Sequence, residues 1–263
     1  MSWHVVALAY FAYLVVTSWL RPEFAPARGR LLTAALIGGA LTTIDFAYQP
    51  GAAWSLVIIP SLILLGGYRM SGLLFVRVDA RAETWLRQSD DRWLRRTGVL
   101  PAFDRAPVVV REFFELSYML VYVALPAGAI VLLASGQAAG AARYWTIVLL
   151  AEFVCYAVLP WVQTRPPMLL EARPPASSND GLLRRFNQAI ASRGSIHANT
   201  IPSGHAAGAF ACALAIGDAQ PISGALFAAL AVSIAAASVL GRYHYAADAV
   251  LGFAVAIVAW LVV

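Results

Sequence analysis

The sequence predicts an all-α fold, a polytopic membrane helix bundle with about eight transmembrane helices. Hydrophobic residues make up 60% of the 263 residues, and charged residues only 13%. With a mean hydropathy of +0.70, the chain is too apolar for an ordinary soluble domain. Several apolar runs also approach the roughly 20 residues that a helix needs to cross a bilayer. Runs bounded by Arg, Pro or Gly predict spans at residues 3–20, 31–48, 53–75, 113–135, 144–162, 203–218, 221–240 and 243–263.

The first predicted span is interpreted as a retained helix. It follows a short start without basic residues, and no small-residue cleavage site precedes Arg21, so a signal peptide is not favoured. The sixth span is short and carries His205 near its start. Cys155 and Cys212 fall inside spans, where they are interpreted as small apolar residues without a disulfide or metal role.

The basic residues give conflicting information on orientation. All 19 are arginine. If successive spans cross the membrane in alternating directions, 18 of the arginines lie on one side of the membrane and only Arg143 lies on the other. Such asymmetry normally marks the cytoplasmic side. However, the planar guanidinium also matches phosphate oxygens, so a phosphate site on that face would collect arginines as well. Charge alone therefore leaves the orientation open.

Several ionisable residues fall inside predicted spans, where they are costly and need partners. For Asp45 and Glu152 a structural hydrogen-bonding role is favoured. Glu112 and Glu115 open the fourth span, and either a functional role or pairing with an arginine fits them. His197 is interpreted as a loop residue.

The loop at 76–112 contains a predicted helix in the headgroup plane. Over residues 78–96, apolar side chains including Trp85 and Trp93 gather near one helical face, with Arg and Asp elsewhere. This helix could guide a lipid toward a site or serve as an anchored connector, and the sequence leaves both readings open.

Two short motifs carry the candidate chemistry. A Pro-Ser-Gly-His sequence ends at His205, and His244 is followed four residues later by Asp248. Phosphoryl transfer through a protein nucleophile needs an unprotonated imidazole, a group that orients it, and an acid for the leaving alkoxide. If the eighth span is helical from Tyr243, Asp248 lies on the same face as His244 and can hold one ring N–H. His205 follows a Ser-Gly turn, where free backbone N–H groups at a helix start favour phosphate.

These motifs resemble those of the type-2 phosphatidic acid phosphatase superfamily of membrane lipid phosphatases and phosphotransferases. Its members carry Lys-x6-Arg-Pro, Pro-Ser-Gly-His and Ser-Arg-x5-His-x3-Asp on a six-helix core. Here the second motif is intact at 202–205, and the His-x3-Asp end of the third is present at 244–248. The resemblance implies a six-helix phosphatase-like core at 53–263, including the loop at 76–112, preceded by two additional helices at 1–52.

The first and third motifs depart from the family pattern. Arg165-Pro-Pro followed by Arg173-Pro replaces the first motif, and Ser238 stands where the third has its arginine. Arg-Pro-Pro together with Arg-Tyr-His-Tyr is more similar to the branch that includes inositol phosphorylceramide synthase. The resemblance implies His244 as nucleophile, Asp248 as the residue that orients it and His205 as general acid. It implies a phosphate cradle formed by Arg165, Arg173, Ser203, Gly204 and Arg242.

Three functions follow as alternatives. The first is a membrane lipid phosphatase that hydrolyses a lipid phosphate or diphosphate through a phosphohistidine. The second is a lipid phosphotransferase of the inositol phosphorylceramide synthase type, and the third a non-enzymatic carrier or a haem or quinone protein. The first two involve a lipid phosphate substrate and the bilayer, with no nucleic acid, metal or cofactor. Family precedent favours a bacterial-type plasma membrane with the site on its extracytoplasmic face.

Overall fold

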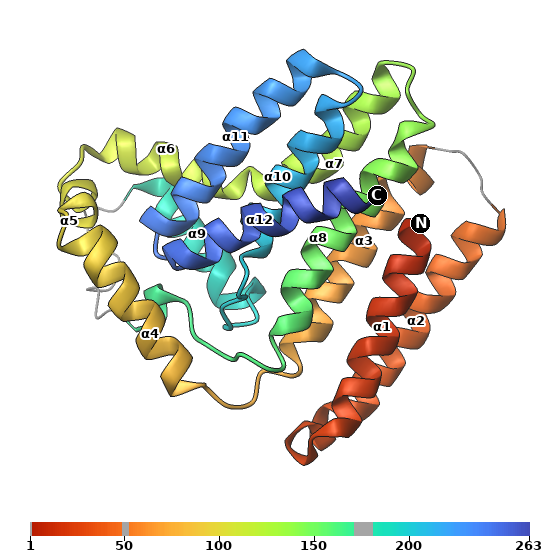
Figure 1. The fold of residues 1–263 in the computed structure, drawn as a ribbon, viewed down its shortest axis with the longest axis horizontal. Coiled ribbons are helices and arrows are strands. Elements are labelled where there is room, and N and C mark those ends of the chain that lie inside the picture. The colour runs from red at the N-terminus through yellow and green to blue at the C-terminus, as the bar shows by residue number, and fades with distance from the viewer. Residues whose placement is uncertain (1, 49–52, 171–180) are drawn as a thin grey trace.

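The computed structural model describes residues 2–48, 53–170 and 181–263, and it confirms the all-α prediction (Figure 1). The first three helices and α8 lie side by side, while α10, α11 and α12 pack together in the second half of the chain. The α-helices are α1 (Trp3–Leu20), α2 (Arg28–Tyr48), α3 (Ala53–Gly72), α4 (Ala80–Asp90), α5 (Val99–Asp104), α6 (Val108–Met119), α7 (Val121–Ala134), α8 (Gly140–Val158), α9 (Leu182–Gly194), α10 (Gly204–Gly217), α11 (Pro221–Leu240) and α12 (Ala246–Val262).

Each of the eight predicted spans corresponds to a helix or a pair of helices. Five segments, containing α1, α2, α3, α8 and α11, are long and apolar enough to cross a bilayer. The pair α6 and α7 forms a sixth candidate span, and α10 and α12 are apolar but shorter. His205 lies at the N-terminal end of α10, and His244 lies just before α12.

The fourth predicted span, 113–135, is not one continuous helix. It is divided at Leu120 into α6 and α7, which meet at an angle of 54°. Pro126, on the second turn of α7, has no N–H to donate to the Tyr122 carbonyl, so one further helical hydrogen bond is missing just after the break. The break places Tyr118 and Tyr122 on differently directed helices.

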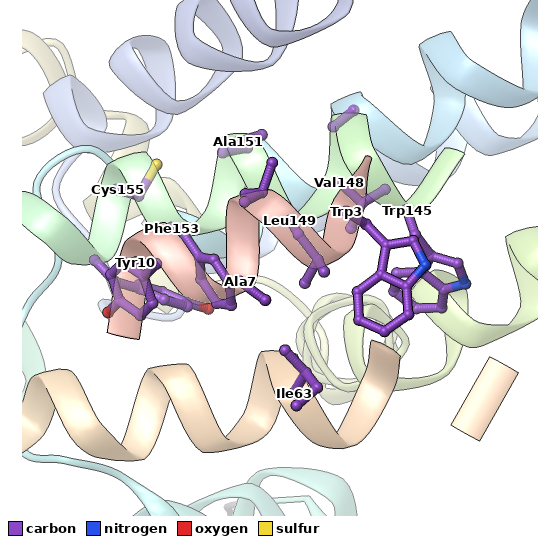
Figure 2. Close-up of a cluster of buried hydrophobic side chains, with 14 of the residues drawn as sticks. Trp3, Ala7, Tyr10, Ile63, Trp145, Val148, Leu149, Ala151, Phe153 and Cys155 are labelled. Atoms are coloured by element: carbon purple, nitrogen blue, oxygen red, sulfur yellow. The ribbon is translucent and has the colours of Figure 1, made fainter. Parts of the chain in front are cut away.

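The core between α1, α3 and α8 is built from apolar and aromatic side chains (Figure 2). Tyr10 of α1 stacks on Phe153 of α8 with ring centroids 4.1 Å apart. The indole Nε1 of Trp145 donates to the Leu56 carbonyl of α3 at 2.7 Å. The first contact joins α1 of the N-terminal addition to α8, and the second joins α3 to α8.

The polar residue Asp45 of α2 has a structural role. Its carboxylate lies 3.0 Å from Nε2 of His4 and accepts a hydrogen bond from the Ser55 hydroxyl at 2.5 Å. The carboxylate therefore links α1, α2 and α3 in the way its isolated position in an apolar run predicts.

Helix α10 lies at the centre of the site region and contacts α7, α8, α11 and α12. Its close approach to α12 depends on Gly252, where a Cβ atom would lie 2.5 Å from the carbonyl oxygen of Ser203. Any larger residue would force the two helices apart, and with them the segments that carry His205 and His244.

Helix α4 forms most of the predicted helix at 78–96. The Asp79 side chain accepts from the N–H groups of Arg81 and Ala82, both at 3.0 Å, and so caps its N-terminus. Leu86 is buried against the protein, whereas Trp85 and Trp93 are exposed. After Asp90 the chain continues in a short π-helical turn, Asp91–Arg95.

Candidate functional site

The two motif histidines lie next to each other. His205 is the second residue of α10, and His244 belongs to the segment that joins α11 to α12. Nε2 of His244 is 3.4 Å from Nδ1 of His205, and only 5% of the His244 surface is exposed. Residues 39 positions apart in sequence thus form one buried pair at the start of two adjacent helices.

Asp248 faces the opposite side of the His244 ring. Nδ1 of His244 lies 3.7 Å from Oδ2 of Asp248, slightly beyond hydrogen-bonding distance. The expected helix start at Tyr243 is wrong, because α12 begins at Ala246. Asp248 nevertheless faces His244, because the extended backbone of Tyr245 directs the preceding residue back over the first turn of α12.

A polar residue that the sequence reasoning missed fixes the Asp248 carboxylate. Nδ2 of Asn199 donates to Oδ2 of Asp248 at 2.9 Å, and the Tyr245 N–H donates to the same oxygen at 3.0 Å. Asn199 also donates to the hydroxyl of Thr164 at 3.1 Å. Asn199 lies only a few residues before the Pro-Ser-Gly-His motif, but an isolated loop asparagine gives no sequence signal of this contact.

The backbone around His244 is held by the end of α11. The N–H groups of Tyr243 and His244 both donate to the Ser238 carbonyl, at 2.8 and 3.0 Å. Arg242 adopts a left-handed conformation with φ of 65°, a position after a helix end that glycine usually occupies. The turn therefore reverses the chain sharply and fixes the direction of the His244 side chain.

Ser203 and Gly204 form the start of α10. The Ser203 hydroxyl caps the helix by accepting from the Ala206 N–H at 3.3 Å, and the Gly204 N–H donates to the Thr200 hydroxyl at 3.4 Å. The Ser203 N–H donates to the Asp248 carbonyl at 2.9 Å. These groups join α10 to α12 directly beside the histidine pair, and their contact with a phosphate stays a prediction.

Arg165, which replaces the basic residue of the first motif, is held by Glu83 of α4. Its Nε and Nη2 donate to the two carboxylate oxygens at 3.1 and 2.8 Å, and its backbone N–H donates at 3.1 Å. The Arg165 hydrogen bond lowers the pKa of the Glu83 carboxyl, and the same contact raises the pKa of Arg165. The Tyr245 hydroxyl donates to the Arg165 carbonyl at 3.2 Å, which links this pair to the His244 segment.

Arg242 is also paired with a carboxylate. Its Nη2 donates to Oδ2 of Asp104 at 2.7 Å, and its side chain is only 4% exposed. Helix α4 supports the next residues of the segment, because Asp90 accepts from the Ala246 N–H at 3.1 Å. Arg173, the remaining arginine of the predicted phosphate cradle, lies outside the described residues.

Glu115 of α6 connects the site to α9. The Tyr243 hydroxyl donates to Glu115 Oε2 at 2.6 Å, Asn187 donates to the same oxygen at 2.7 Å, and Arg184 forms an ion pair with Oε1. Glu115 and Arg184 are both buried. Of the two roles that the sequence left open for Glu115, the structure supports the pairing with an arginine, and it attaches this pair to the residue before His244.

Two tyrosines from the broken span cover His205. The Tyr118 ring lies between Tyr243 and His205, with ring centroids 3.8 and 4.9 Å away, and both pairs are stacked. The Tyr122 hydroxyl is 3.4 Å from Nε2 of His205. One ring nitrogen of His205 therefore faces His244 and the other faces Tyr122.

Chemically, the arrangement can supply a nucleophile beside a second proton-transfer group. Asp248 lies next to one nitrogen of His244, which leaves Nε2 as the nitrogen available to attack. His205 can exchange a proton with an oxygen near that nitrogen. Among the described residues, no group of three or more His, Cys, Asp or Glu side chains is arranged to hold a metal ion.

The fold and this site define the class of protein: an all-α integral membrane protein with a buried His-His-Asp centre surrounded by arginine–carboxylate pairs. The family model of the PAP2 superfamily matches residues 80–262. The chain belongs to this superfamily, as the Pro-Ser-Gly-His and His-x3-Asp motifs predicted. Neither a curated protein nor a solved structure matches it. The membership supports a lipid enzyme of the phosphatase or phosphotransferase type, and the matched stretch leaves α1 to α3 outside it.

Proposed function

We propose that this protein is an integral membrane lipid phosphatase that hydrolyses a lipid phosphate or diphosphate through a phosphohistidine at His244. The observation that carries the proposal is the position of the His244 ring. Asp248 lies beside Nδ1, and Nε2 faces His205 at 3.4 Å. In this proposal the negative charge of Asp248, 3.7 Å away, favours a proton on Nδ1, so the lone pair of Nε2 is free for attack on phosphorus.

In the first step, a bond forms between Nε2 of His244 and phosphorus while the bond from phosphorus to the lipid oxygen breaks. His205 gives a proton to that leaving oxygen, so the lipid departs as an alcohol, or as a monophosphate when the substrate is a diphosphate. In the second step a water oxygen attacks the phosphohistidine, the P–N bond breaks, and the water proton passes to His205. Inorganic phosphate is released, and both histidines return to their starting protonation states.

The proposed phosphate cradle consists of Arg165, Arg173, Arg242 and the start of α10 at Ser203 and Gly204. Arg165 and Arg242 support it because carboxylates on α4 and at the end of α5 fix them close to the His244 segment. A guanidinium that is already fixed loses less side-chain entropy when it binds phosphate oxygens.

The second candidate is a phosphotransferase of the inositol phosphorylceramide synthase type. Arg-Pro-Pro at 165–167 and Arg-Tyr-His-Tyr at 242–245 favour it. It needs no different catalytic residue, because only the acceptor that reaches the phosphohistidine changes from water to an alcohol.

A phosphate-release assay on the purified protein tests the proposal. Phosphatidate, lysophosphatidate, a polyprenyl diphosphate and a sphingoid phosphate are compared, each with and without inositol and other alcohols. Hydrolysis predicts free phosphate without an acceptor, whereas a transferase forms the phosphate monoester of the acceptor alcohol, and only when that acceptor is added. His244→Ala should abolish turnover and the acid-labile phosphoprotein, while His197→Ala, an exposed histidine outside the pair, should leave both unchanged. Substantial activity in His244→Ala would refute the mechanism.

We also propose that the site faces the extracytoplasmic side of a bacterial-type plasma membrane. The side chain of Arg96 is 74% exposed and that of Arg143 is 43% exposed, and the predicted topology puts them on opposite faces. Because both native cysteines are buried, Arg96→Cys should react with an impermeant thiol reagent added to intact cells, and Arg143→Cys should not. The reverse pattern would place the site in the cytoplasm.

A further inference from the structure

An apolar cavity of about 430 Å³ reaches His205 from the lipid-facing side of the bundle. Helices α3 and α7 form its walls, with Leu62 and Leu65 on one side and Val121 and Pro126 on the other. Leu62 and Leu65 are 51% and 55% exposed, so the cavity borders the surface that meets the hydrocarbon of the bilayer. Its volume falls in the range of about 300–1,000 Å³ that is typical of small-molecule sites.

The inner end of this cavity is polar. Glu152 of α8 lines it together with Tyr156 and His205. Only 2% of Glu152 is exposed, and its carboxyl oxygen Oε2 has no hydrogen-bond partner among the described residues. A buried acceptor without a donor is costly, so its presence in a ligand-sized cavity needs an explanation.

The fold makes room for this carboxylate beside the site. A Cβ atom at Gly208 would lie 2.0 Å from Oε1 of Glu152, and one at Gly204 would lie 2.6 Å from Oε2. Two glycines one turn apart therefore form a notch on α10 that holds the Glu152 carboxyl next to His205. Replacement of either glycine would expel the carboxyl from this position.

The geometry points to a lipid-binding site: we propose that the cavity holds a hydrocarbon chain of the lipid phosphate, and that Glu152 accepts a hydrogen bond from a hydroxyl or amide N–H close to the phosphate. This inference rests on the proposed function. A lipid whose hydrocarbon chain lies between α3 and α7 has its polar end at His205, the residue that faces His244. A lipid that offers only ester oxygens at this level leaves Oε2 without a donor, so the site selects lipids that carry one.

Filling the cavity tests whether the hydrocarbon chain of the lipid lies there. Leu65→Trp adds bulk to the α3 wall, and Leu226→Trp makes the same change at an exposed position of α11 that does not line the cavity. Leu65→Trp should lower kcat/KM for dodecyl phosphate by about tenfold or more, since hydrophobic pockets discriminate by this order. Turnover of p-nitrophenyl phosphate should not change, and Leu226→Trp should affect neither substrate. An unchanged rate with dodecyl phosphate, or an equal loss with both substrates, would overturn the inference.

A pair of alkyl phosphates tests the role of Glu152. Wild-type protein should prefer 2-hydroxydodecyl phosphate over dodecyl phosphate by about tenfold, the order expected for one hydrogen bond to a buried acceptor. Glu152→Leu should abolish this preference, and Glu152→Gln, which keeps an accepting oxygen, should retain part of it. The inference fails if wild-type protein shows no preference or if Glu152→Leu preserves it.

A binding measurement separates this inference from the proposed function. A dodecyl phosphate with a diazirine at the end of its chain should crosslink to peptides of α3 and α7, in wild-type protein and in His244→Ala. Crosslinks there without phosphate release from any substrate would support the chain site and refute the phosphatase proposal. Phosphate release with crosslinks only on other helices would refute the chain site and leave the phosphatase proposal standing.

Discussion

Two buried regions of the molecule are held together by different forces. One is the contact of α1 and α3 with α8, and the other surrounds the His205–His244 pair. In the first, aromatic and aliphatic side chains pack together, and hydroxyl and indole groups donate to backbone carbonyls. In the second, carboxylates fix arginines and backbone N–H groups from distant parts of the chain. The packing of the first region is tolerant of similar apolar side chains, because dispersion and burial have little directionality.

The charged region around the histidine pair does not tolerate such changes. A buried ion pair contributes little net stability, but the loss of one partner leaves an uncompensated charge. The site is therefore well defined in geometry and sensitive to single substitutions. The following variants test this difference between the two regions, beginning with the largest expected effect.

His205→Ala should show the largest effect, on catalysis. General acid catalysis contributes about 10²–10⁴-fold, so turnover of an alkyl phosphate should fall by that factor. An aryl phosphate has a leaving group that needs no proton, and its turnover should fall much less. Steady-state rates with dodecyl phosphate and p-nitrophenyl phosphate measure the two losses. Equal losses would show that His205 is not the acid.

Arg184→Met should give the largest loss of stability. It leaves Glu115 buried without its cation, which costs about 3–5 kcal/mol for a buried pair. The adjacent Arg185 is exposed, so Arg185→Met provides the same change without a buried partner. Denaturant unfolding in detergent micelles compares the free energies of unfolding. Similar values for the two variants would show that the Glu115–Arg184 pair does not stabilise the site region.

Glu83→Gln should give a smaller effect that depends on pH. Arg165 holds the pKa of Glu83 below its usual range, so the folded protein binds this proton less readily than the unfolded chain. The contribution of the pair is fully present above the ordinary carboxyl pKa of about 4.3 and is lost as the pH falls through the lower folded value. The difference in thermal midpoint between wild type and Glu83→Gln should therefore shrink as the pH is lowered toward 3. Glu23→Gln, at an exposed carboxylate, is the control, and its thermal midpoint should differ less from that of wild type at neutral pH. A difference for Glu83→Gln that grows in acid would contradict the lowered pKa of Glu83.

Tyr10→Phe should show the smallest effect, confined to stability. The variant keeps the stacking on Phe153 and loses one hydrogen bond, to the Gly67 carbonyl at 3.2 Å, which is worth about 0.5–1.5 kcal/mol. Catalytic constants should be unchanged. Tyr48→Phe, at a residue that is 80% exposed, is the control. A loss of activity in Tyr10→Phe at full stability would mean that the apolar region acts on the site directly.

The residues around His244 show how far sequence reasoning reaches. The spacing of His244 and Asp248 placed the two side chains together, although the helix that was expected to carry both begins only at Ala246. Asn199, which holds Asp248, had no pattern to reveal it. Arg165 and Arg242 were singled out as basic residues near the motifs, but their partners Glu83 and Asp104 lie 82 and 138 positions away in sequence.

The sequence by itself determined the membrane helix bundle, the superfamily and the histidine–aspartate motifs. It could do so because long apolar runs and short spacings are local properties of the chain. Only the tertiary structure decided which carboxylates hold Arg165, Arg184 and Arg242. It alone also decided where the span at 113–135 breaks and that Glu152 lies in a glycine notch beside His205. These features depend on which helices pack against one another, and a single helix pattern does not encode its neighbours.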